Sequence, residues 1–363
     1  MMGKRRTVLL VGGGSGGHIY PNIAVAERLY GLDTDLAVHF VVSDRPLDNT
    51  IMSQDSLEHT ATLARPFSAR PVCWADFVCG YYRACAQVSA LIERTSATAM
   101  IATGGFVSAP AVAAAVKKNL PVALVNLDSL PGKANRLVAR KVQAVFSVYL
   151  TAVLPGAQQI GLPLRLAALA TEPASVSRRH FGLEPQAQTL LVFAGSQAAR
   201  SINQMMMQFC AHASLAGWQV LHIAGEQDRQ AVSNAYSQAG VQATVLPYCH
   251  QMGLAWSAAT VAICRAGAGS VAEAWTNRVP AVFMPYPHHQ DHHQAQNVRP
   301  LVDRGGAVLL TDLVDPNANA QRLQSVLPPL LGDSQQQQQM RGCLEQNQFV
   351  DGADILAKWA LSH

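Results

Sequence analysis

Residues 7–29, TVLLVGGGSGGHIYPNIAVAERL, decide the fold that this sequence is expected to adopt. A short apolar run leads into five glycines between Gly12 and Gly17, and a longer helical pattern follows from Pro21. An apolar run that meets a helix through glycines is typical of the strand–turn–helix unit of a parallel α/β sheet. Pro21 suits the first turn of such a helix. The stretch therefore predicts a first strand, a glycine turn and a first helix.

The same rhythm runs along the whole chain and restarts once. Short strand-like runs alternate with helical patterns in the first half, and a second series begins at Thr189 with TLLVFAGSQ. This alternation predicts βαβ units and a parallel sheet in each half. The length of 363 residues also favours two domains. We expect domains at residues 1–160 and 161–345, with a hinge in the proline-containing segment 155–185.

Composition argues against several classes of protein. The chain has 27 Lys and Arg against 23 Asp and Glu, and the net charge of +4 is too small for a typical nucleic-acid binder but suits an anionic substrate or surface. The seven cysteines include no Cys-x-x-Cys pair, so neither a disulfide framework nor a zinc ribbon is predicted. A reducing cytoplasm is the expected setting. No segment approaches the ~20 apolar residues of a membrane span.

The first glycine turn has three possible roles: it could bind a dinucleotide, bind another phosphate, or only form a tight turn. Gly12, Gly14 and Gly17 match the dinucleotide pattern G-x-G-x-x-G, and Asp44 closes the next strand-like run, where a ribose-binding carboxylate would lie. Backbone amides at a helix N-terminus suit any phosphate equally well, and the glycines could also serve only a tight turn. His18 is a candidate general base toward a sugar hydroxyl, or else a packed residue.

Further glycine turns follow other predicted strands. TGGFVSAP (residues 103–110) lies in the first half, and FAGSQAARSINQ offers Ser196 as a helix cap in the second. CRAGAGSVAEA (residues 264–274) places Gly267 and Gly269 at a helix start, with Glu273 expected inside the first turn. This helix N-terminus could hold a diphosphate without a metal, which would leave Glu273 to bind a ribose. The alternative is that Glu273 caps its own helix.

Residues 286–297, YPHHQDHHQAQN, combine histidines with amides. The four histidines are His288, His289, His292 and His293. Their i,i+4 spacing suits zinc in a helix, but no Cys or Glu completes a ligand set, and we expect no metal. Gln294 and Asn297 lie three apart on a presumed helix face, where their amides could bond sugar hydroxyls. A solvated polar helix is the alternative.

The segment at residues 65–85 mixes arginines with aromatic residues. The arginines are Arg65, Arg70 and Arg83, and the aromatic residues are Phe67, Trp74, Phe77, Tyr81 and Tyr82. Such a mixture can lie in the headgroup region of an anionic membrane. The alternative is an amphipathic helix packed on its own sheet.

Together these motifs resemble the MurG family, the UDP-N-acetylglucosamine:lipid I N-acetylglucosaminyltransferases of peptidoglycan synthesis. The resemblance covers nearly the whole chain, and the motifs occur in the family's order. They are GGGSGGHIYPNIAVAERL, GGFVSAPAVAAA, PGKANRLVAR, GLPLR, AGSQAARSIN, CRAGAGSVAEA and HQAQN.

The resemblance implies a GT-B glycosyltransferase fold, in which two Rossmann-like doubly wound domains face a cleft. A final helix, here within residues 346–363, would cross back to the first domain. The implied reaction is inverting transfer of GlcNAc from UDP-GlcNAc to the 4-hydroxyl of MurNAc in lipid I (undecaprenyl-pyrophosphoryl-MurNAc-pentapeptide), which forms lipid II. The implied setting is peripheral, on the anionic cytoplasmic face of the inner membrane, with no cofactor, metal or nucleic acid.

The resemblance also assigns site residues. His18 is the candidate general base. The acceptor is expected near Ser15, Gly16 and Gly17, with Gly14, Tyr20, Gly104, Gly105 and Phe106 around them. The UDP-sugar is expected at Arg165, Ser196, Cys249, Ala268, Gly269, Ser270, Val271, Ala272, Glu273, Gln294 and Asn297. In this set Cys249 would lie near the uracil, residues 268–273 around the ribose and diphosphate, and Gln294 with Asn297 at the GlcNAc.

One departure from the family pattern lies at residues 125–128, where the chain has VNLD and the family commonly has HEQN. The asparagine expected near the donor sugar becomes Asp128, which can accept bonds from hydroxyls but would repel a diphosphate. This departure leaves another glycolipid acceptor as an alternative. A NAD-dependent dehydrogenase and a nonenzymatic sugar-nucleotide sensor are the alternatives outside the transferase class.

Overall fold

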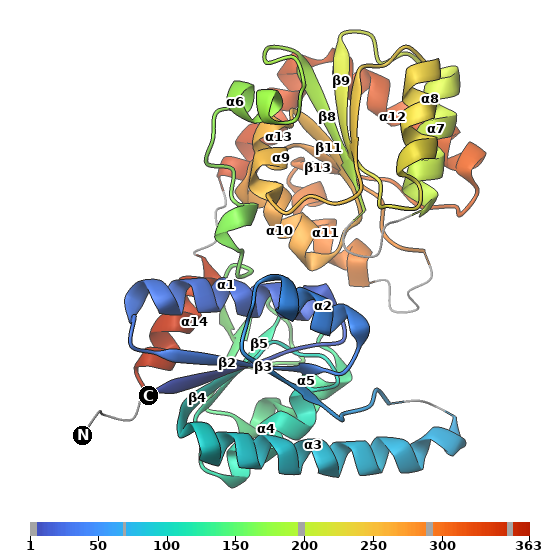
Figure 1. Cartoon of the computed structure of the whole chain (residues 1–363). Helices are drawn as coiled ribbons and strands as arrows, with labels where there is room; N and C mark the ends of the chain where they lie inside the picture. Colours follow the sequence, from blue (N-terminus) through green and yellow to red (C-terminus); the bar gives the residue numbers. More distant parts are fainter. Residues whose placement is uncertain (1–5, 68–69, 195–199, 288–292, 347–350) are drawn as a thin grey trace. The chain divides into compact units, whose positions relative to one another are not determined.

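The computed structural model describes residues 6–67, 70–194, 200–287, 293–346 and 351–363 (Figure 1). The chain divides into two compact units. Unit 1 is Met1–Arg165 together with Phe349–His363, and unit 2 is Leu166–Gln348. The division falls within the proline-containing segment 155–185, and the last residues of the chain group with the first ones.

Unit 1 contains a sheet of seven strands in the order β3-β2-β1-β4-β5-β6-β7. The strands are β1 (Thr7–Val11), β2 (Ala37–Ser43), β3 (His59–Thr62), β4 (Ala97–Ala102), β5 (Val122–Asn126), β6 (Ala144–Ser147) and β7 (Gln158–Gln159). Each strand pairs with its neighbours in parallel. Parallel neighbours need crossover connections, and right-handed crossovers place helices on both faces of the sheet.

The helices of unit 1 cover both faces of its sheet (Figure 1). On one face lie α1 (Gly16–Leu32), α2 (Pro46–Gln54) and α14 (Gly352–Leu361). On the other lie α3 (Trp74–Thr95) and α4 (Ser108–Lys117), with α5 (Lys133–Val138) packed against α4. Two short 3-10 turns are η1 (Pro71–Cys73) and η2 (Ala139–Lys141). The central strand β1 is buried over its whole length, as expected for a strand covered twice.

Helix α14 returns to unit 1 and packs on α1. Its buried face is made of small and apolar residues, among them Ala353, Leu356, Ala357 and Ala360. Arg28 of α1 binds the carboxylate of Asp351 at the start of α14 (2.7 Å) and donates to the carbonyl of Leu164 (3.4 Å). One guanidinium thus joins the first helix, the last helix and the end of the segment that leads to unit 2.

Unit 2 contains a parallel sheet of six strands in the order β10-β9-β8-β11-β12-β13. The strands are β8 (Gln188–Phe193), β9 (Trp218–Ile223), β10 (Ala243–Leu246), β11 (Val261–Cys264), β12 (Ala281–Phe283) and β13 (Ala307–Leu309). One face carries α7 (Arg200–His212), α8 (Arg229–Gln238) and α12 (Pro316–Gly332). The other carries α6 (Ala174–His180), α9 (Met252–Ala258), α10 (Ala268–Thr276), α11 (His293–Asp303) and α13 (Ser334–Glu345). The 3-10 turn η3 (Leu166–Ala168) precedes them.

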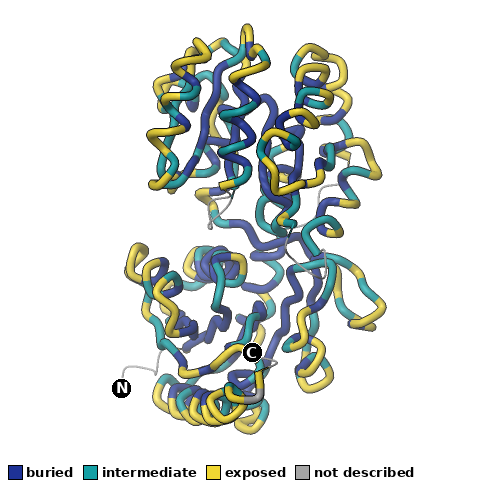
Figure 2. Tube along the Cα trace, turned by 90° about the vertical axis from the view of Figure 1, so that its right-hand side faces the viewer, coloured by how far each residue is buried: buried dark blue, intermediate teal, exposed yellow. Residues whose placement is uncertain are grey.

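Both faces of the unit 2 sheet carry a hydrophobic core. Along β8, Leu190 and Val192 belong to one buried cluster, and Leu191 and Phe193 belong to the other. This alternation follows from the two-residue period of a strand. Figure 2 shows the strands as the buried interior of each unit, with exposed residues along the outer sides of the helices.

The doubly wound α/β architecture expected from the sequence is confirmed. The strand-like runs TVLLV, VHFVVS, AMIATGG, PVALVN and AVFSVY of the first half correspond to β1, β2, β4, β5 and β6. The runs TLLVFAGSQ, GWQVLHIAG, ATVLPY, ATVAIC and VPAVFMPYP of the second half correspond to β8 through β12. The sequence did not predict β3, β7 and β13, which all lie at sheet edges and are short and partly exposed. The glutamine tract at residues 335–339 lies in α13, where Gln337 is buried.

Candidate active site

His18 lies in the first turn of α1, beyond the carboxyl end of β1. Its Nδ1 is 3.0 Å from the carbonyl oxygen of Thr103, which follows β4. Because a carbonyl only accepts hydrogen bonds, Nδ1 carries the hydrogen and the neutral imidazole keeps its lone pair on Nε2. The residue is half-buried, so the ring is held in place without being sealed from solvent. This arrangement suits a general base.

The turn after β4 lies beside this histidine. Gly104 and Gly105 both have positive φ, at +108° and +79°. A Cβ on Gly104 would stand 3.1 Å from Cε1 of His18, and one on Gly105 would overlap the carbonyl of Gly13. Only glycine therefore allows the two turns to approach so closely. Strands β1 and β4 are neighbours, but the chain goes from β1 to β2 on one side of this pair and from β4 to β5 on the other. The turns after β1 and β4 therefore lie at the topological switch point, where doubly wound sheets bind ligands.

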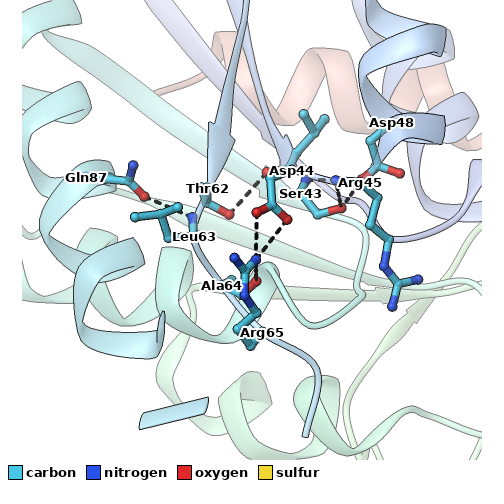
Figure 3. Close-up of polar contacts among 10 residues, drawn as sticks. Ser43, Asp44, Arg45, Asp48, Thr62, Leu63, Ala64, Arg65 and Gln87 are labelled. Atoms are coloured by element: carbon cyan, nitrogen blue, oxygen red, sulfur yellow. Dashed lines mark hydrogen bonds and ion pairs between the residues drawn. The ribbon is translucent and has the colours of Figure 1, made fainter. Parts of the chain in front are cut away.

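A buried carboxylate of helix α2 binds the first glycine turn. Asp48 is fully buried, and its Oδ2 accepts from the amide of Gly14 (2.7 Å), the amide of Ser43 (3.1 Å) and the hydroxyl of Ser43 (2.6 Å; Figure 3). Arg45 donates to the carbonyl of Gly14 at 2.9 Å, and its guanidinium lies 5.0 Å from the ring centre of Phe106. The amide of Gly14 is thus engaged by the protein itself.

The residues after Gly14 begin helix α1. Ser15 is the N-cap, and its side chain makes no capping bond to the helix. Gly16 is buried and Gly17 is exposed, with open space where a Cβ would lie apart from the Ser15 hydroxyl at 3.7 Å. A helix start without a side-chain cap offers its first amides to an anion.

Asp44, the carboxylate of the dinucleotide interpretation, is paired with an arginine. Arg65 Nη1 binds both of its oxygens, at 2.9 and 2.7 Å (Figure 3). A ribose-binding carboxylate needs its oxygens for the 2′-hydroxyl. The contact with Arg65 therefore argues against that interpretation.

Asp128 lies in the loop that follows β5, in a group of polar side chains. Asn126 donates to the carbonyl of Asp128 (2.7 Å) and to the hydroxyl of Ser147 (3.0 Å), and it accepts from Asn135 (3.4 Å). Burial, together with the charge of Asp128, raises the pKa of Tyr149 far above its ordinary value. The sequence predicts Asp128 as a site residue but neither Asn126 nor Asn135, although these two lie in the stretches VNLD and PGKANRLVAR.

Two further residues of the expected site stack on each other in unit 1. The guanidinium of Arg165 lies 4.1 Å from the ring centre of Tyr20, within cation–π range. Arg165 was expected with the UDP-sugar and Tyr20 with the acceptor. The structure brings the two side chains together in unit 1, whose first segment ends at Arg165.

In unit 2, residues 268–273 begin helix α10, with Gly267 as its N-cap. Glu273 lies in the second turn and not in the first, because the helix begins only at Ala268. Its carboxylate accepts from the indole of Trp256 at 2.8 Å. Burial, and after it the charge of Glu273, raises the pKa of Cys264, and burial and Glu273 both raise that of Cys249. Glu273 thus accepts a bond from Trp256, and its position in the second turn is too far from the N-cap for it to cap its own helix.

A buried ion pair that was not predicted from the sequence lies beyond the carboxyl ends of strands β11 and β13 in unit 2. Arg265 follows β11, and its Nη1 lies 2.9 Å from the carboxylate of Asp312 beyond β13. The same guanidinium donates to the carbonyl of Met284 (2.9 Å) and to the hydroxyl of Ser201 (2.7 Å). Burial alone would raise the pKa of Asp312, but its hydrogen bonds hold it below the ordinary value. An arginine directly after a buried strand was the available signal for this pair.

The two amides of the HQAQN motif lie on α11 as expected. Gln294 accepts from the amide of Tyr286 through Oε1 (2.8 Å), and Asn297 is fully buried. Ser196, His288, His289 and His292 lie outside the described residues. Within the ranges that the structure describes, no three His, Cys, Asp or Glu side chains are grouped to hold a metal ion.

Comparison with known proteins decides the family. Residues 8–147 match the glycosyltransferase family 28 N-terminal domain, and residues 189–356 match its C-terminal domain. A protein of Nocardioides sp., named UDP-N-acetylglucosamine--N-acetylmuramyl-(pentapeptide) pyrophosphoryl-undecaprenol N-acetylglucosamine transferase, is 34% identical over 90% of both chains. A protein of Streptomyces avermitilis with the same name is 30% identical over 96% of both chains. The chain belongs to the MurG family of glycosyltransferases.

Solved structures agree with the fold of the MurG family. The crystal structure of Acinetobacter baumannii MurG is 21% identical, covers 99% of this chain and all of its own, and superimposes with a TM-score of 0.77. Medicago truncatula UGT71G1, complexed with UDP-glucose, is 12% identical with a TM-score of 0.67 over 99% of both chains. The GT-B architecture is therefore shown, and membership of the MurG family sets aside the dehydrogenase alternative.

Proposed function

We propose that this chain transfers GlcNAc from UDP-GlcNAc to the MurNAc 4-hydroxyl of lipid I and so forms lipid II. The observation that carries the proposal is the orientation of His18 in a chain 30–34% identical to transferases of that name. Its Nδ1–H is committed to Thr103, so Nε2 is the nitrogen that accepts a proton.

The reaction is a single displacement. The MurNAc 4-hydroxyl oxygen attacks the anomeric carbon of GlcNAc, and its proton passes to Nε2 of His18. The bond between the anomeric carbon and the phosphate oxygen breaks, and UDP leaves with the electron pair. Attack opposite to the leaving group inverts the configuration, so the new glycosidic bond is β.

The donor is assigned to unit 2. The N-terminus of α10 would stabilise the diphosphate through its first amides, since Gly267 supplies no side-chain cap. Glu273, oriented by Trp256, would accept from the ribose hydroxyls. Developing negative charge on the departing UDP is then met by backbone dipoles, and the scheme requires no metal.

A turnover assay tests this proposal. Purified protein with UDP-GlcNAc and a lipid I analogue is expected to release UDP and to form a β-linked disaccharide product. Parallel reactions with other glycolipids distinguish a different acceptor. Folded protein, shown by a cooperative melting curve, that releases no UDP would overturn the proposal. A sugar-nucleotide sensor would bind UDP-GlcNAc with no turnover and no effect of His18→Ala.

The anionic membrane surface and a peripheral position at the cytoplasmic face of the inner membrane belong to the same proposal. The N-terminal half of α3 and the segment before it support membrane contact. Exposed fractions there are 59% for Phe67, 83% for Val72, 52% for Trp74 and 69% for Tyr82. None of residues 74–79 of α3 is buried, whereas from Gly80 onward one face of the helix, with Ala84 and Val88, packs into the core. No helix among the described residues is long and apolar enough to cross a membrane.

Vesicle binding tests the membrane contact. Trp74→Ser with Tyr82→Ser is expected to reduce cosedimentation with phosphatidylglycerol vesicles several-fold, because both exposed rings are lost. Tyr30→Ser is the control, since Tyr30 is 43% exposed on α1, on the opposite face of the sheet. Equal binding of the wild type to neutral vesicles would contradict an electrostatic contribution.

A further inference from the structure

Ser108 is the first residue of α4 and is fully buried. Its hydroxyl makes two hydrogen bonds to a single residue of the turn after β4. It donates to the carbonyl of Gly104 at 2.6 Å and accepts from the amide of Gly104 at 3.1 Å. Because the side chain is closed off from solvent and both bonds go to the backbone, Ser108 serves this turn and does not contact a substrate.

The two bonds hold Gly104 in a conformation that residues with side chains rarely adopt. Its φ is +108°. Glycine reaches this region without strain, but it also loses more conformational freedom on folding than any other residue. The direction of its amide depends on φ, and the direction of its carbonyl depends on ψ. A partner that binds both groups therefore fixes both angles and offsets the flexibility of the glycine.

The amide of Gly104 belongs to the same peptide group as the carbonyl of Thr103. That carbonyl accepts from Nδ1 of His18 at 3.0 Å. The peptide bond is trans, so its N–H and its C=O point in opposite directions. Ser108 and the imidazole of His18 thus bind opposite sides of one peptide group, and an effect of the serine on the ring passes through that group.

Thr103 fixes the other end of this peptide group. It is fully buried, its amide donates to the carbonyl of Val11 at 2.9 Å, and its hydroxyl donates to the carbonyl of His18 at 2.7 Å. Thr103 is therefore held on β1 and the start of α1, while Gly104 is held on α4. With both ends fixed, the carbonyl between them has a defined orientation toward the imidazole.

The bond to Ser108 also makes the Thr103 carbonyl a stronger acceptor. A peptide group whose N–H donates a hydrogen bond is more polarised, and such bonds strengthen one another along a chain. When Nε2 of His18 takes up a proton, the ring becomes a cation and the bond from Nδ1 becomes charge-assisted. A more polarised carbonyl stabilises this cation better. Before the reaction, the same bond keeps the hydrogen on Nδ1 and the lone pair on Nε2.

We propose that Ser108 is a positioning residue for the general base and acts on His18 through the Thr103–Gly104 peptide group. The inference rests on the proposed function, since it deepens the role that His18 has there. In a Ser-His-Asp triad a buried carboxylate orients the histidine. Here a neutral peptide group supported by a serine does so, and it adds no anion beside substrates that carry diphosphates.

A turnover assay with UDP-GlcNAc and a lipid I analogue tests this role. Ser108→Ala should lower kcat about tenfold and change both KM values less than about twofold, because only the base is disturbed. Ser108→Thr keeps the hydroxyl but adds a methyl group to a packed site, so it should lose stability and keep kcat within about twofold of wild type. Loss of kcat in proportion to melting temperature across these variants would contradict positioning.

Thr62→Val is the matched control. Thr62 is buried in the edge strand β3 of the same sheet, and its hydroxyl donates to the carbonyl of Val42 at 3.1 Å. The variant loses the same kind of buried bond in unit 1 without touching the turn after β4. It should lower the melting temperature and leave kcat unchanged.

The tautomer of His18 gives a readout that a merely structural role would not move. In protein made with isotope-labelled histidine, nitrogen NMR identifies the His18 signals by their absence from His18→Asn. Wild type should carry the hydrogen on Nδ1, whereas Ser108→Ala should show a share of molecules with the hydrogen on Nε2. Folded Ser108→Ala with the wild-type tautomer, or wild type with the hydrogen on Nε2, would overturn the inference.

A double-mutant cycle shows whether Ser108 acts through His18. In the His18→Asn background the base is absent, so Ser108→Ala should have no further effect on kcat, and additive losses would overturn the inference. Wild type that transfers no GlcNAc disproves the proposed function, while the tautomers of wild type and Ser108→Ala still test the positioning. Turnover by wild type, with kcat and tautomer unchanged in Ser108→Ala, overturns the inference alone.

Discussion

His18 Nδ1 donates to the carbonyl of Thr103 across 3.0 Å, and this one bond decides which nitrogen of the ring is basic. Thr103 is itself fixed, because its hydroxyl donates to the carbonyl of His18 at 2.7 Å. The two residues therefore hold each other through reciprocal bonds between the turns after β1 and β4. The orientation of the ring follows from the backbone.

Two substitutions of His18 separate its chemistry from its packing. The side-chain amide of His18→Asn can replace the bond to Thr103, whereas His18→Ala loses it. Both remove Nε2, so kcat should fall by about 10²–10⁴ in each. Only His18→Ala should also lower the melting temperature. Activity in His18→Asn within a few-fold of wild type would show that another group accepts the proton.

Gly14→Ala should destabilise unit 1. Gly14 has φ of +88°, and a Cβ would lie 2.7 Å from the ring of Phe106. We expect the free energy of unfolding in urea to fall by about 2 kcal/mol or more, from backbone strain together with steric overlap. Gly240→Ala is the control, because Gly240 has φ of +66° with nothing within 4 Å and tests the strain alone. Equal losses in both variants would contradict the overlap with Phe106.

Trp256→Phe should weaken donor binding without affecting the acceptor. The variant removes the indole N–H that holds Glu273 at 2.8 Å but keeps an aromatic ring in the core. The KM for UDP-GlcNAc is expected to rise about three- to tenfold, the effect of a lost bond to a charged group. In the control, Trp275→Phe, the lost bond goes to the carbonyl of Leu344, and only stability should change. An unchanged donor KM in Trp256→Phe would show that Glu273 does not need this bond.

Stability should fall with acid because of His222. This residue is fully buried, and burial lowers its pKa to about 3 from 6.5. Between these values the unfolded chain binds a proton that the folded chain does not. Stability is therefore complete above about pH 6.5 and decreases below it by about 1.4 kcal/mol per pH unit from this group. His222→Gln should have a shallower dependence between about pH 7 and pH 5 in urea unfolding. Parallel curves for the two proteins would contradict this assignment.

The sequence predicted the parts of the site that depend on local pattern. A strand, glycines and a helix in succession identify the turn of His18, because the turn requires glycine whatever surrounds it. The same holds for residues 104 and 105 and for the start of α10 at Ala268. Glu273 was misplaced by one helical turn, since Gly267 caps the helix and begins it later than the motif suggested.

Pairs that join distant segments were not predictable from pattern. The contacts of Asn126 with Asn135 and of Arg265 with Asp312 depend on which strands are neighbours and where each one ends. The contact of Glu273 with Trp256 likewise joins α10 to α9. Edge strands were not predicted from the sequence for a related reason. Strand β7, for example, has the polar sequence Gln158–Gln159 and is recognisable only by its pairing with β6.

Helix α14 is held to α1 through Arg28 and Asp351. Because α14 is the last helix of the chain, unit 1 depends for its folding on residues that are synthesised last. A ribosome delivers most of unit 1 first, yet the residues that cover this face of α1 emerge only after all of unit 2. Until then the apolar surface that receives Leu356 and Ala357 stands open to solvent. Unit 2 can be completed while the chain is still being translated, whereas unit 1 is begun first and finished last.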